Sequence, residues 1–259
     1  MDAKITSPQT KNINRLMEDA LVEASPDKDG GTQCLFGQDG EFKDALVTLI
    51  RRFTAKVPDF TLAREILGND FISPKGIALV RGLTYSEEQV AELERTLPDR
   101  ETLEWLRRND YYLVAGSPRE MSLLDLRELE CRYFYLKEGG WYSNKAETFA
   151  HTEKVTCRWY MLRKGIVPNS TSNTWIKQKN LLCDLETVPT AVELVWGMTC
   201  YKAVMGVYLL VSIYARTSSV DSYDQHVVVW RFDADGLRVD HWYDGYPNYV
   251  GVSSSRKAL

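Results

Sequence analysis

The stretch between residues 225 and 250 constrains this chain most, because it holds two strand patterns around a turn. Successive side chains of a strand point to opposite faces of a sheet. One face of the two expected strands is apolar and carries Val227, Val229, Leu237 and Val239. Phe232 lies at a strand end, where the turn can fold its ring back over the same side. The pattern predicts an antiparallel hairpin that packs one face on a core.

The other face of this hairpin combines large aromatic residues with charges. It carries His226, Val228, Trp230, Arg238, Asp240 and Trp242, and the following loop adds Tyr243, Tyr246, Asn248 and Tyr249. Arg231 and His241 lie at strand ends, off this alternation, and we include them in the set. Aromatic rings beside charges are typical of a binding interface. The alternative is a strand pair buried on both faces, but charged residues at alternate positions argue against it.

The composition is that of an ordinary soluble globular protein, with 44% hydrophobic and 26% charged residues among 259. The net charge of −4 argues against non-specific binding of nucleic acid as the main role. The five cysteines are odd in number and lack C-x-x-C spacing, which favours reduced thiols. We find no signal-peptide pattern and no apolar run of about 18 residues. We therefore expect a cytoplasmic protein without a membrane span, with surface or virion display by another route left open.

Three regions follow one another along the chain. Residues 1–40 are polar and Gly-rich and predict a flexible leader. Residues 41–109 predict a helical region, with helices at 61–67 and 100–108 and two more opened by Ser73 and Ser86. The segment 73–96 also permits a helix-turn-helix regulator that binds nucleic acid. The acidic residues of its second helix argue against contact with a phosphate backbone.

Residues 110–259 predict a single domain of the α+β class. The expected strands cover 111–114, 132–136, 156–162, 207–216, 225–232, 237–241 and 249–254, and the expected helices cover 121–129, 175–185 and 191–204. Strands precede a pair of helices, and antiparallel-looking strands follow them. This order differs from the regular alternation of strands and helices that builds a parallel sheet.

Three short motifs in this region resemble those of the C-type-lectin-like fold. VPTAVELVW at 188–196 is similar to the start of that fold's second helix, YARTSS at 214–219 to a strand end, and GVSSSR at 251–256 to the closing strand. Ala191 and Leu194 depart from the helix motif, where the family has Glu and Trp. The order of elements is also similar to the bacterial and phage branch of the fold. That branch includes sulfatase-modifying domains and the variable proteins of diversity-generating retroelements.

The resemblance to the variable proteins implies a ligand-binding display protein rather than an enzyme. In those proteins the last strands and loops bind the ligand, and the retroelement rewrites codons for exposed positions. Here the resemblance implies that residues 225–250 form a hypervariable surface for a protein or another macromolecular ligand. The calcium motifs of classical lectins are absent, so no sugar-binding calcium is expected at the usual place. No cysteine follows Cys200, which argues against formylglycine-generating chemistry.

Other chemistries have weaker sequence support. The three histidines, at positions 151, 226 and 241, lack the spacing of a metal site. No phosphate-binding loop or G-x-S-x-G elbow occurs. Aspartates near strand ends are typical of turns, with loose calcium binding as the alternative. We expect no catalytic residue, metal or cofactor. An enzyme on the same fold with an unrecognised active site stays the alternative, and the ligand and oligomeric state stay open.

Overall fold

The structure is a computed structural model that describes residues 59–242 and 248–257, without the side chain of Trp242. All described residues belong to one compact unit, Pro58–Leu259. The expected leader at 1–40, the first part of the expected helical region, and the loop residues Tyr243 and Tyr246 lie outside the described residues. The described part combines helices with two small mixed sheets, so the predicted α+β class is confirmed.

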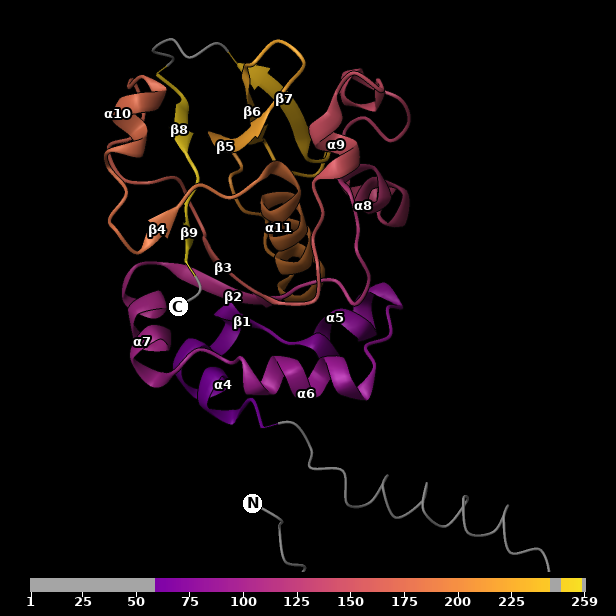
Figure 1. Ribbon diagram of the computed structural model, residues 1–259, viewed down its shortest axis with the longest axis vertical. Helices are drawn as coiled ribbons and strands as arrows, with labels where there is room; N and C mark the ends of the chain where they lie inside the picture. Colours follow the sequence, from indigo (N-terminus) through magenta and orange to yellow (C-terminus); the bar gives the residue numbers. More distant parts are fainter. Residues whose placement is uncertain (1–58, 243–247, 258–259) are drawn as a thin grey trace, which may run out of the picture. The chain divides into compact units, whose positions relative to one another are not determined.

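Two sheets form the framework (Figure 1). The first has the strand order β1-β2-β3-β9-β4, with β1 at Phe71–Ile72, β2 at Tyr111–Ala115, β3 at Trp159–Arg163, β4 at Glu186–Thr187 and β9 at Ser255–Arg256. The second has the order β7-β6-β5-β8, with β5 at Tyr214–Val220, β6 at His226–Trp230, β7 at Arg238–Trp242 and β8 at Val250–Val252. The chain therefore builds the second sheet late and returns to the first with β9, which pairs with β3 and β4.

Short helices and one longer buried helix, α11, pack on the sheets. Their bounds are α4 at Thr61–Leu67, α5 at Pro74–Arg81, α6 at Glu87–Arg95, α7 at Arg100–Arg108, α8 at Leu123–Leu129, α9 at Thr148–Thr152, α10 at Trp175–Lys179 and α11 at Ala191–Met205. Single 3-10 turns occur at Gly68–Asp70, Cys131–Tyr133 and Trp141–Ser143. Helices α4 to α7 lie around β1 and β2, with α4 and α6 below these strands and α7 and α5 on either side (Figure 1). Strand β1 pairs in parallel with β2, so the residues before and after the expected domain boundary at 109/110 share one sheet.

Helix α11 connects the two sheets, because it contacts β1, β2 and β3 of the first and β5 and β6 of the second (Figure 1). A capping box between Thr190 and Glu193 begins the helix, and Gly206 in the left-handed conformation ends it. Most of its residues are buried on all sides, as expected for a helix without a polar face. Gly197 allows close packing, since a Cβ there would lie 2.3 Å from Leu162 Cδ1. No helix of the described part is both long and apolar enough to cross a bilayer.

Several predicted elements are confirmed at their ends. Helices α4 and α7 begin and end at the predicted residues. The Ser73 side chain caps α5 with Pro74 at its first position, and Ser86 forms a capping box with Gln89 at the start of α6. Helix starts with such caps can be predicted from the sequence, because the capping side chain satisfies backbone N–H groups that lack partners within the helix.

Three predictions were wrong over part of their length. The segment 132–136 forms a 3-10 turn and a single bridge between Phe134 and Leu237 instead of a strand. The helix expected at 175–185 ends at Lys179, and Leu181 and Leu185 are exposed. The strand expected from 207 begins only at Tyr214. In each case a short apolar or aromatic run favours regular structure in the sequence, but such runs also occur in irregular segments that pack on a core.

Candidate ligand-binding face of the four-stranded sheet

The predicted hairpin is present and has the predicted inner face. Strands β6 and β7 are antiparallel, with Val229 opposite Val239 and Trp230 opposite Arg238. The scaffold residues are buried, as expected from the alternation, and they are Val227, Val229, Phe232, Leu237 and Val239. Because these side chains fix the register against the core, the opposite face of the hairpin is fixed as well.

A continuous row of side chains crosses the outer face of the second sheet, and we call it the aromatic ladder. Its members, in spatial order, are Tyr135, Arg238, Trp230, Tyr214 and Tyr249. The Arg238 guanidinium carbon lies 3.8 Å from the Tyr135 ring centroid and 5.0 Å from that of Trp230. Trp230 stacks on Tyr214 with centroids 4.0 Å apart and planes 15° apart. Tyr249 then lies 5.2 Å from Tyr214.

The ladder is partly accessible to solvent along its whole length. Tyr135 and Tyr249 at its ends are 49% and 43% exposed. Arg238, Trp230 and Tyr214 between them are half-buried. Burial raises the pKa of Tyr214, and the neighbouring Tyr249 and Asp240 raise it further. The Tyr214 hydroxyl is therefore neutral near pH 7 and can donate a hydrogen bond.

Sequence reasoning found three ladder members and missed two. Tyr135 follows a 3-10 turn and reaches the sheet because Gly236 lets the hairpin turn approach it. A Cβ at Gly236 would lie 2.6 Å from the Tyr135 backbone nitrogen, and its φ is +109°. Tyr214 faces Trp230 across the β5–β6 pairing. Tyr214 was visible as the first residue of YARTSS, but only the pairing of β5 with β6 places it on this face.

Val228 is a correction to the predicted face, because it is 0% exposed. Its cross-strand neighbour Arg216 is buried too, and Arg216 Nη1 donates to Gln178 Oε1 at 2.8 Å. The segment around α10 therefore covers this part of the sheet. The half-buried ring of His226 also packs against Trp175 of α10, with centroids 3.9 Å apart. Strand alternation identifies a face, but it does not reveal which distant segment covers it.

The remaining predicted residues lie around the ladder. Arg231 is exposed at the end of β6, with a positive φ of 47°, and forms an ion pair with Asp233 at 3.1 Å. Asn248 is exposed, and its Oδ1 accepts a hydrogen bond from Ser172 Oγ at 3.1 Å. Asp240 is half-buried, and its Oδ1 accepts from the backbone N–H of His241. The side chains of Trp242, Tyr243 and Tyr246 lie outside the described residues.

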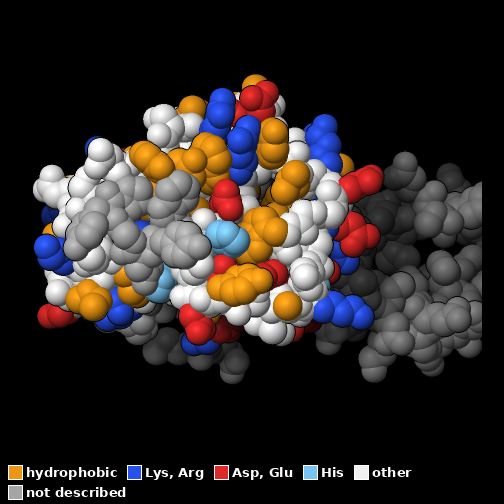
Figure 2. Space-filling model, turned by 90° about the horizontal axis from the view of Figure 1, so that it is seen from above, with side chains coloured by type: hydrophobic (Ala, Val, Ile, Leu, Met, Phe, Trp, Pro, Cys, Tyr) orange, Lys and Arg blue, Asp and Glu red, His pale blue; other side chains and the backbone are white. Residues whose placement is uncertain are grey.

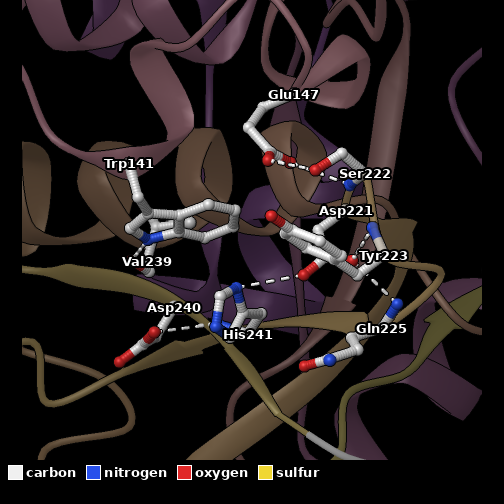
Figure 3. Close-up of polar contacts among 9 residues, drawn as sticks. All are labelled: Trp141, Glu147, Asp221, Ser222, Tyr223, Gln225, Val239, Asp240 and His241. Atoms are coloured by element: carbon white, nitrogen blue, oxygen red, sulfur yellow. Dashed lines mark hydrogen bonds and ion pairs between the residues drawn. The ribbon is translucent and has the colours of Figure 1, made fainter.

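His241 belongs to a separate polar cluster at the end of the hairpin (Figure 3). Its Nδ1 lies 3.0 Å from Oδ2 of Asp221, whose side chain is fully buried. Asp221 Oδ1 accepts backbone hydrogen bonds from Tyr223 and Gln225, each at 2.8 Å. The Trp141 ring packs on the imidazole, with centroids 4.8 Å apart. His241 is out of step with the strand positions that carry the ladder. Its side chain contacts the 141–149 segment and not the aromatic ladder.

This cluster connects three segments of the chain. The Trp141 indole donates to the Val239 carbonyl at 3.0 Å, and Ser222 donates from both its backbone and its hydroxyl to the buried Glu147. A buried carboxylate beside an imidazole is also the arrangement that orients a general base. The neighbouring Ser222 hydroxyl, however, donates to Glu147 and not to His241. The hydrogen bonds of this cluster stabilise the β5–β6 turn and the end of β7.

The surface at this end of the molecule is chemically mixed (Figure 2). Hydrophobic side chains gather around a histidine, with basic side chains on one rim and acidic ones between them. Within residues 59–242 and 248–257, no group of three or more His, Cys, Asp or Glu side chains converges to hold a metal ion. A shallow hollow of about 340 Å³ is lined by residues 81–84, 118–119 and 129. None of these residues belongs to the ladder.

Comparison with protein-family models, with curated proteins and with solved structures finds no match for this chain. The candidate site therefore depends on its own geometry: a half-exposed aromatic ladder on a sheet face whose opposite side is core.

Replacement of Asp221 tests the structural role of the polar cluster. We expect Asp221→Ala to lower the free energy of unfolding by about 2 kcal/mol, because it leaves two backbone N–H groups without their acceptor and removes the carboxylate beside the imidazole. Urea denaturation measures the change. Asp235→Ala in the exposed hairpin turn is the control and should change stability by less than about 0.5 kcal/mol. Equal stability of the two variants would contradict the assigned role.

Proposed function

We propose that this protein is a binding protein and that the aromatic ladder is its contact surface for a protein ligand. The observation that carries the proposal is the continuous half-exposed stack of Tyr135, Arg238, Trp230, Tyr214 and Tyr249. A soluble protein has little reason to place a row of large rings at its surface unless they contact a partner. Tyr, Trp and Arg are the residues that most often dominate binding energy at interfaces.

The ladder is already ordered before any ligand binds. Trp230 is held between Arg238 on one side and the stacked Tyr214 ring on the other. The three strands that carry these residues, β5, β6 and β7, bury their opposite faces in the core. Rings that are fixed in this way lose little conformational entropy on association, so more of the contact energy appears as affinity.

The C-type-lectin-like fold and the variable-protein branch belong to the same proposal. Helix α11 begins within VPTAVELVW, the strands of the second sheet follow it, and the closing strand β9 returns to the first sheet. These features support the resemblance. The short α10 is less similar to a full first helix.

The diversified positions under this proposal would be the solvent-facing ones. Sequencing of sibling copies or related strains should show substitutions that cluster after residue 225, at the ladder positions Trp230, Arg238 and Tyr249 and in the loop, and spare Val227, Val229, Leu237 and Val239. The buried Val228 is expected to stay constant with them. A reverse transcriptase gene beside this gene would agree with this pattern. Substitutions spread evenly along the chain would contradict diversification, and they would leave the binding role of the ladder untouched.

Selection from a library of random displayed peptides tests the binding role directly. We expect the wild-type protein to enrich a related set of peptides. Trp230→Ala and Tyr214→Ala should each weaken the affinity for those peptides roughly 30-fold or more, because both rings lie at the centre of the stack. Titration calorimetry with synthetic copies of the enriched peptides measures the change.

Tyr223→Ala is the matched control, because Tyr223 is 75% exposed but lies on the β5–β6 turn outside the ladder. It should bind the peptides as the wild type does. Circular dichroism and thermal melting establish that each variant is folded. Unchanged peptide binding by folded Trp230→Ala would refute the proposed function.

A further inference from the structure

We infer that the ligand presents a carboxylate to Arg238, so that the partner is a protein segment with one acidic side chain among apolar ones. This inference rests on the proposed function of the ladder and adds the chemistry that the ladder selects.

Arg238 differs from Arg231 and Arg132 because it forms no ion pair within the described part of the chain, although its charge helps to lower the pKa of the nearby Asp233. Arg231 pairs with Asp233 at 3.1 Å, and Arg132 pairs with Glu130 at 2.9 Å. Among the described residues, Arg238 packs on the rings of Tyr135 and Trp230. No carboxylate among the described residues lies within ion-pair distance of it. Asp240, two residues on, uses one oxygen for the His241 amide.

Within the described part of the chain, the buried polar atoms around Arg238 that lack a hydrogen-bond partner are donors. The Arg238 Nε–H and the Trp230 indole N–H are both buried and find no acceptor among the described residues. A guanidinium between two rings is shielded from water, which strengthens a hydrogen bond to an incoming charge. A carboxylate offers two acceptor oxygens in one plane, which is the geometry that a guanidinium binds best. The ladder therefore combines flat apolar contact with one cationic, donor-rich position.

The surrounding charges favour a single carboxylate over the phosphates of a nucleic acid. Asp240 lies on the same strand, and Asp233 and Asp235 lie in the adjoining turn. The net charge of the whole chain is −4. A polyanion gains affinity from several cations along its path, and acidic neighbours would repel it. A carboxylate within a mixed protein segment needs only one cation and places apolar side chains on the neighbouring rings.

The test uses the peptides selected on the wild-type protein, each made in three forms with Glu, Gln or Lys at the acidic position. We expect the wild-type protein to bind the Glu form about tenfold or more tightly than the Gln form. Arg238→Gln should remove this preference, so that the Glu and Gln forms bind this variant with equal affinity. Arg238→Glu should instead prefer the Lys form, an inversion that a purely structural role of Arg238 would not produce.

Arg95→Gln is the charge-matched control, because Arg95 is an exposed arginine on α6 that pairs with Glu92. It should keep the wild-type preference. If Trp230→Ala abolishes binding but the Glu and Gln forms bind equally, the carboxylate inference fails and the binding role survives. If Trp230→Ala binds normally, the proposed function itself fails. Tighter, Arg238-dependent binding of single-stranded oligothymidine than of any peptide would overturn the inference in favour of a nucleic-acid ligand.

Discussion

The burial of α11 between two sheets is the constraint on which the rest of the structure depends. Its side chains are buried on nearly all sides, and it contacts strands of both sheets. The Trp196 indole donates to the Ala115 carbonyl on β2, so the helix is held to the first sheet by a buried hydrogen bond as well as by packing. The inner face of the β6–β7 hairpin packs on the same core. Because that face is fixed, the opposite face can hold an ordered row of aromatic rings at the surface.

The ladder and the polar cluster have different roles in this arrangement. The ladder lies on the outer face of the sheet and offers rings and one cation whose charge is not paired within the described residues. The cluster around Asp221 and His241 lies at the end of the hairpin and ties it to the 141–149 segment. Backbone amides, the imidazole and an indole all contribute to that cluster. A rigid support beneath a contact surface lowers the entropic cost of binding.

The sequence predicted local structure well where a side chain acts on its own neighbourhood. The caps at Ser73 and Ser86, the alternation of Val227 and Val229, and the inward turn of Phe232 all involve residues close in sequence. Prediction failed where a distant segment decides the outcome. Val228 is buried in a part of the sheet that the segment around α10 covers, and Tyr135 joins the face through contact with the turn at Gly236. Neither effect leaves a periodic signal in the chain.

The central claim is that the aromatic ladder contacts a ligand, and the indole N–H resonance of Trp230 reports on it most directly. Titration of the ¹⁵N-labelled protein with a selected peptide should shift the Trp230 indole signal, because its ring lies at the middle of the ladder. The Trp196 indole, which is buried and bonded to Ala115, should keep its position. A saturating peptide that leaves the Trp230 signal unmoved would place the binding surface elsewhere and contradict the account.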